Sequence, residues 1–121
     1  MARILTILVL DDNADNADAL AELLSMEDHK VRVVYSGQEA IEAYRSMPFD
    51  LGFFDVMMPG KNGVDSFLEI REQRPDAKVY FMTGFSADDL LKKAMAGGAL
   101  GVFGKPVDLP RVLDVCGQQA A

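Results

Sequence analysis

The sequence predicts a single α/β domain built on a doubly wound parallel sheet. Short apolar runs alternate five times with segments whose apolar residues recur at helical spacing. The 121 residues suit one domain rather than two. Strict alternation of strand and helix favours a parallel sheet with helices on both faces and right-handed crossovers. We therefore expect five strands and five helices.

The five expected strands are short runs rich in apolar and β-branched residues. They are Ile4–Leu10, Val31–Tyr35, Leu51–Phe54, Lys78–Met82 and Leu100–Phe103. The first run is almost wholly apolar, which is typical of a strand covered on both faces.

The expected helices lie between these runs. They are Ala14–Ser25, Gln38–Met47, Val64–Gln73, Ala87–Ala96 and a last helix that begins near Asp108. Asn13 is a candidate N-cap of the first, and Gly97-Gly98 is a normal end for the fourth. Pro48 and Pro75 end the second and third helices.

Composition excludes several classes of function. Half of the residues are hydrophobic, which is enough for a real core, and the formal net charge is −7. Such an acidic surface repels nucleic acid, so we expect no direct DNA or RNA binding.

One cysteine and one histidine cannot make an internal disulfide or a zinc site. No run reaches the ~20 apolar residues of a membrane span, and we expect no membrane segment and a cytoplasmic location.

Polar side chains follow four of the apolar runs where each run ends. These residues are Asp11, Asp12, Asp55, Thr83 and Lys105. Ligands of open parallel α/β sheets bind at the carboxyl ends of the strands, so we expect these five residues to form one site. Three carboxylates, a hydroxyl and an ammonium group indicate a divalent cation together with a phosphoryl group.

Each residue type suits a step of phosphoryl transfer. Carboxylate oxygens are the ligands that Mg²⁺ (or Mn²⁺) prefers, and without a cation their repulsion should raise at least one pKa. Asp55 is the candidate nucleophile, because a carboxylate can form an aspartyl-phosphate. Lys105 and Thr83 can pair with phosphate oxygens. The bond between Lys105 and Pro106 could be cis or trans.

Over essentially its full length the chain resembles a response-regulator receiver domain of the CheY-like family. The resemblance is carried, in order, by Leu8-Val9-Leu10-Asp11-Asp12-Asn13, Asp55-Val56-Met57-Met58-Pro59-Gly60 with Gly63, Met82-Thr83-Gly84, Gly98-Ala99 and Lys105-Pro106. Each piece alone is weak, but their order on the expected elements is highly specific. The resemblance implies a flavodoxin-like sheet with strand order 2-1-3-4-5.

The resemblance also implies a function for the site. Asp55 would accept a phosphoryl group, in the presence of Mg²⁺, from a sensor histidine kinase or a histidine phosphotransfer protein. Asp11, Asp12, Asp55 and the backbone carbonyl of Met57 would hold the metal. The chemistry would be limited to phosphorylation and autodephosphorylation of Asp55, so we expect a phosphorylation switch in two-component signalling rather than an enzyme.

One position departs from the family pattern. An aromatic residue commonly stands three positions before the lysine, where this chain has Val102. Phe103 follows it, but strand alternation directs that ring to the opposite face. Phe85, two residues after Thr83, is bulky enough to cover a phosphoaspartate, which predicts slow autodephosphorylation.

We expect phosphorylation to act on the helix at 87–96, the fifth strand and the final helix. The mixed charges of this face suit a protein contact or a homodimer. We expect residues 1–121 to form a single receiver domain without an output domain, acting on a downstream partner or a fused output domain. The stretch 11–20 is similar to receivers of hybrid sensor kinases.

Three other functions use a similar fold or a similar set of residues. A haloacid-dehalogenase-type phosphatase also uses aspartate, lysine and Mg²⁺, but its nucleophile follows the first strand and lies two residues before a second aspartate. A flavodoxin-like FMN carrier needs a loop of amide donors for the phosphate, whereas the first loop here is acidic. A receiver fold that serves as an unphosphorylated docking module is also compatible with the sequence.

Overall fold

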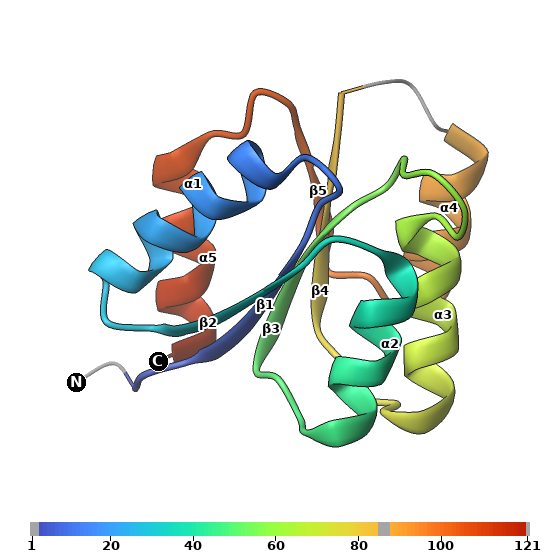
Figure 1. Cartoon of the computed structure of the whole chain (residues 1–121), viewed down its shortest axis with the longest axis horizontal. Helices are drawn as coiled ribbons and strands as arrows, with labels where there is room; N and C mark the ends of the chain where they lie inside the picture. The colour runs from blue at the N-terminus through green and yellow to red at the C-terminus, as the bar shows by residue number, and fades with distance from the viewer. Residues whose placement is uncertain (1–2, 85–87, 121) are drawn as a thin grey trace.

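The computed structural model describes residues 3–84 and 88–120, which form a five-stranded parallel sheet covered on both faces by helices (Figure 1). The strands follow the order β2-β1-β3-β4-β5, and every neighbouring pair is parallel. Their bounds are β1 Thr6–Leu10, β2 Lys30–Val34, β3 Leu51–Asp55, β4 Val79–Thr83 and β5 Gly101–Gly104. The predicted fold class and strand order are confirmed.

The helices divide between the two faces of the sheet. They are α1 Ala14–Met26, α2 Gly37–Ser46, α3 Gly63–Gln73, α4 Asp88–Ala96 and α5 Leu109–Ala120. Helices α1 and α5 cover one face, and α2, α3 and α4 cover the other (Figure 1). No helix of the described ranges is long and apolar enough to span a membrane.

Side-chain caps fix where the first three helices begin. The side chains of Asn13, Ser36 and Asn62 each accept a hydrogen bond from the backbone N–H three residues later. Such caps satisfy N–H groups that have no partner within the helix. The predicted cap at Asn13 is confirmed.

Strand alternation separates the apolar core into two clusters. Leu8, Phe54 and Val102 face α2, α3 and α4, whereas Phe53 and Phe103 face α1 and α5. The opposite orientation of Val102 and Phe103 is therefore as predicted. Because the central strands of a doubly covered sheet contribute to both clusters, their side chains are apolar on both faces, whereas the edge strand β2 carries the exposed Lys30 and Arg32.

Every predicted strand was wrong at one or both ends, by one or two residues, and β2, β4 and β5 were each displaced by one residue. Asp55 and Thr83 are the last residues of β3 and β4 rather than the first residues beyond them, because both remain in the ladder, Asp55 opposite Met82 and Thr83 opposite Gly104. β1 begins at Thr6 rather than Ile4, since pairing with β2 begins at that residue. The predicted fourth helix begins at Ala87, which lies outside the described residues.

The sheet register brings the carboxyl ends of four strands to one edge. Leu10 pairs with Phe54, Asp55 with Met82, and Thr83 with Gly104. Asp11 and Lys105 directly follow two of these strands. Residues up to 94 positions apart in sequence therefore share this edge.

Candidate functional site

Three carboxylates form an acidic cluster at this edge. Asp11, Asp12 and Asp55 each offer one oxygen, and these oxygens all lie within 4.8 Å of one another. Asp11 and Asp55 are buried, whereas Asp12 is exposed. No other group of histidine, cysteine, aspartate and glutamate in residues 3–84 and 88–120 has such a metal-ligating arrangement. The spacing and the hard oxygen donors fit a divalent cation such as Mg²⁺.

Lys105 enters the cluster from the segment between β5 and α5. Its Nζ lies 3.2 Å from Asp11 Oδ2 and 3.2 Å from Asp55 Oδ2. Its backbone N–H donates to the carbonyl of Thr83 at 2.8 Å, and its peptide bond to Pro106 is cis. One ammonium group thus faces two buried carboxylates.

Burial and charge together set the acidity of the site. Burial, with a further contribution from the Asp11 carboxylate, raises the pKa of Asp55 to about 6, although Lys105 opposes this rise. Burial lowers the pKa of Lys105, but the charges of Asp55 and Asp11 outweigh it and the net shift is upward. The direction of the predicted pKa rise agrees with that at Asp55, but burial contributes more to it than the repulsion between carboxylates on which the prediction was based. The site favours additional positive charge.

The turn after β1 orients Asp11. The backbone N–H of Asn13 donates to Asp11 Oδ1 at 2.9 Å, while the backbone N–H of Asp11 donates to the carbonyl of Val34 at 3.3 Å. The Asn13 side chain in turn accepts from the Asn16 N–H and caps α1. The start of α1 and the end of β2 thereby hold one carboxylate of the cluster.

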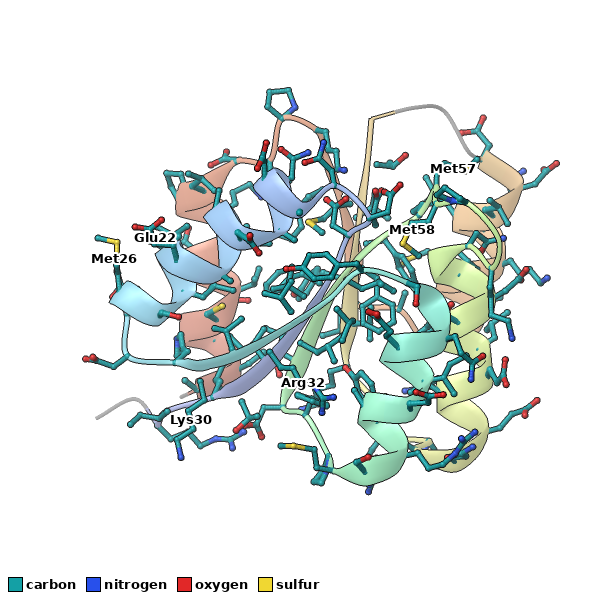
Figure 2. The ribbon with its side chains drawn as sticks, viewed as in Figure 1. Glu22, Met26, Lys30, Arg32, Met57 and Met58 are labelled. Carbon is teal, nitrogen blue, oxygen red and sulfur yellow. The ribbon has the colours of Figure 1, made fainter. Side chains whose placement is uncertain are left out.

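Thr83 and the two methionines lie near the acidic cluster or in the segment that follows β3. Thr83 is buried at the end of β4, on the same edge as the acidic cluster. Met57 and Met58 lie between β3 and α3 (Figure 2). The Met57 side chain is half-exposed, whereas Met58 belongs to the core between the sheet and α2, α3 and α4.

Two features of the site region were not anticipated from sequence. A groove of about 520 Å³ runs between α1 and the segment after β5, and it reaches Asp11 and Lys105. Its walls include Ala19, Leu20 and Pro106.

The second feature is the close approach of Gly63, at the start of α3, to the backbone of Asp55. Gly63 stands in the quoted motif, but its spatial role depends on tertiary packing.

A comparison with protein families identifies the family of this chain. Residues 7–116 match the model of the response regulator receiver domain. The chain belongs to this family. Receiver domains are signalling switches that bind Mg²⁺ at an acidic pocket and interact with histidine kinases and output domains. The predicted resemblance is confirmed, and the phosphatase alternative is not favoured.

Relatives of several architectures match the receiver. The chain is 39% identical to a response regulator receiver protein of Anaeromyxobacter over 89% of its length and 45% of that protein. It is 34% identical to the transcriptional regulatory protein ZraR of Salmonella typhimurium over 88% of its length, but only 24% of ZraR. The chemotaxis protein CheY of Halobacterium salinarum is 32% identical, with 89% of this chain and 90% of that protein covered. The chain thus spans less than half of the first two relatives.

Solved structures share the fold. A CheY-like receiver domain from Methanospirillum hungatei superimposes with a TM-score of 0.89 over 97% of each chain, at 22% identity. NtrX from Brucella abortus gives a TM-score of 0.87 at 28% identity over 98% of this chain and 27% of NtrX. The first likeness shows the fold alone, and in the second the matching region is 27% of NtrX.

Proposed function

We propose that Asp55 is the phosphoacceptor of this receiver and that its phosphorylation switches a partner surface on α4, β5 and α5. The observation that carries the proposal is the meeting of three carboxylates and Lys105 at one buried edge of the sheet. This arrangement combines an anionic nucleophile with sites for the cations that phosphoryl transfer requires.

The reaction is an in-line displacement at phosphorus. A carboxylate oxygen of Asp55 forms a new bond to phosphorus, while the bond between phosphorus and the nitrogen of a phosphohistidine breaks. The histidine keeps that electron pair and takes up a proton as it leaves. The donor is a sensor histidine kinase or a histidine phosphotransfer protein.

Mg²⁺, or Mn²⁺ in its place, fits the acidic cluster. Asp11, Asp12 and Asp55 would hold it together with the Met57 carbonyl, and a bound cation would neutralise charge on the carboxylates and the incoming phosphoryl group. Asp11 is held in place by the Asn13 N–H, which limits the reorganisation needed for binding.

Lys105 and Thr83 act on the phosphoryl group once it is transferred. The Lys105 ammonium, already 3.2 Å from Asp55, pairs with a phosphoryl oxygen. Thr83 supplies a hydroxyl from the neighbouring strand end. Because Lys105 N–H also donates to the Thr83 carbonyl, the two groups are coupled through the backbone of β4 and β5.

The output passes to the face formed by α4, β5 and α5. Phosphorylation adds close to two negative charges and three strong acceptors at the edge that carries Thr83 and Lys105. Val102 lies on β5 in place of an aromatic switch residue, so the signal runs through Thr83 and the segment that follows it. The predicted cover by Phe85 lies outside the described residues and stays a prediction.

The partners and location follow from this function. Residues 1–121 form one receiver domain, and its output is a downstream protein, a fused output domain or a second copy in a homodimer. The chain acts in the cytoplasm, where histidine kinases present their phosphoryl donors. Beyond phosphorylation and dephosphorylation of Asp55 it turns over no substrate.

Intact-mass measurement tests the proposal. The protein is incubated with acetyl phosphate or phosphoramidate, with and without Mg²⁺, beside Asp55→Asn. We expect a Mg²⁺-dependent mass increase of one phosphoryl group that the variant lacks. An unmodified wild-type protein under every condition would contradict the proposal and leave a docking module as the function.

A further inference from the structure

We propose that Gly63 is a positioning residue for Asp55. The first turn of α3 rests on the peptide group of Asp55, because Gly63 has no side chain to separate them. This contact fixes the carboxylate relative to Asp11, Asp12 and Lys105. The inference depends on the proposed role of Asp55 as phosphoacceptor. It adds that Gly63, the first residue of α3, sets the position of the Asp55 backbone.

The geometry leaves no space for a side chain at position 63. A Cβ built on Gly63 would overlap the carbonyl oxygen of Asp55, and it would lie 3.0 Å from the carbonyl carbon of Asp55 and 3.4 Å from Val56 Cα. All three atoms belong to backbone, so none can move away by changing a rotamer. A methyl group at this position must separate α3 from the end of β3.

The backbone of Val56, directly after Asp55, is held on both sides. On one side the Gly63 N–H donates to the Val56 carbonyl at 2.9 Å, and on the other the Val56 N–H donates to the Met82 carbonyl of β4 at 3.0 Å. If α3 is displaced, Val56 loses one of these two hydrogen bonds, and the contact between Gly63 and the Asp55 carbonyl is lost. The carboxylate then moves relative to a cluster whose oxygens lie within 4.8 Å.

Helix α3 provides a matched contact that does not involve Asp55. A Cβ at Gly37, the first residue of α2, would overlap the Ser66 hydroxyl and lie 3.1 Å from the Lys61 carbonyl oxygen. Ser66 is buried, and its hydroxyl donates to the Asn62 carbonyl at 2.8 Å. Here the main obstacle is the end of a side chain, and the contact joins α2 to α3.

The two glycines separate a positioning effect from loss of stability. Gly63→Ala and Gly37→Ala each add one methyl group against α3, so both should lower the melting temperature. Only Gly63→Ala displaces the phosphoacceptor backbone. A displacement of about 1 Å in a reacting group can cost about 100-fold in rate.

The experiment compares these variants with the wild type. The rate of phosphorylation by acetyl phosphate is measured by intact mass, and Mg²⁺ affinity is measured by calorimetric titration. A small donor removes any effect on kinase docking. We expect Gly63→Ala to lower the rate by about 10-fold to 100-fold and to weaken Mg²⁺ binding, and Gly37→Ala to keep both close to wild type.

Two results would overturn the inference. One is wild-type rate and Mg²⁺ affinity in Gly63→Ala, and the other is an equal loss in Gly37→Ala. If Gly63→Ala is unfolded, trimethylamine N-oxide is added to all samples and rates are compared per folded molecule. A wild-type protein that is never phosphorylated contradicts the proposed function instead, so the two failures remain distinct.

Discussion

Two sets of ion pairs lie at opposite edges of the same sheet and differ mainly in burial. At the amino edge, Arg3 Nη1 lies 3.0 Å from Asp50 Oδ1, and the two side chains are 58% and 29% exposed. At the carboxyl edge, Lys105 lies 3.2 Å from both Asp11 and Asp55, and the exposed fractions are 25%, 3% and 9%. The distances are nearly equal, so distance alone does not separate a structural pair from a reactive one.

The difference shows how burial and charge balance produce a chemical site. The amino-edge pair is balanced, and Asp50 also accepts the Thr6 N–H at 2.8 Å, which joins the starts of β1 and β3. The carboxyl edge sets one ammonium group against two buried carboxylates. Solvent screens the first pair, whereas the second group retains excess negative charge that attracts a further cation.

The largest expected effect comes from removing the central cation. Lys105→Ala leaves Asp11 and Asp55 buried without their shared partner, and we expect the free energy of unfolding to fall by about 2 kcal/mol. Arg3→Ala is the matched control and should cost under about 0.5 kcal/mol. Urea denaturation without divalent cations measures both values. Equal losses in the two variants would show that burial does not separate the two edges.

A smaller effect is expected in how the free energy of unfolding of the metal-free protein changes with pH. The folded state raises the Asp55 pKa from 3.8 to about 6, so it binds the proton more tightly than the unfolded chain does in this range. The free energy of unfolding of the metal-free protein therefore falls as pH rises from 3.8 to about 6, and the penalty remains at higher pH. Asp55→Asn removes this penalty. We expect the variant to melt a few degrees above wild type at neutral pH and to lose this advantage near pH 4.

Thermal unfolding followed by circular dichroism, with a chelator present, measures these pH profiles. Saturating Mg²⁺ is the control, because it should stabilise wild type by binding only the folded site and remove the advantage of Asp55→Asn. Parallel pH profiles for wild type and variant in chelator would contradict the assignment of the penalty to Asp55.

The smallest effect is expected at the amino edge. Asp50→Ala removes the acceptor of the Thr6 N–H and the partner of Arg3, and we expect it to cost about 1 kcal/mol in urea denaturation. Phosphorylation by acetyl phosphate should proceed at the wild-type rate, since Asp50 lies at the other end of β3 from Asp55. A slower rate in this variant would show that the two edges are energetically coupled.

Sequence reasoning predicted the fold because each element carries its own local signal. The apolar strands, the Asn13 cap and the Gly97-Gly98 stop depend on neighbours in the chain, and all were found where expected to within a few residues. The least accurate predictions were strand ends. Whether Asp55 still belongs to β3 is decided by its pairing with β4, which local sequence does not specify.

The same division applies to the site. Residue types and their places after apolar runs determined which groups meet at one edge, because the carboxyl ends of parallel strands must share it. Tertiary structure alone decided that Lys105 bridges Asp11 and Asp55, that burial raises the pKa of Asp55, and that Gly63 touches the Asp55 backbone. These properties depend on the distances between residues far apart in the chain and on their burial from solvent. Both are set only when the chain folds, so local sequence patterns do not reveal them.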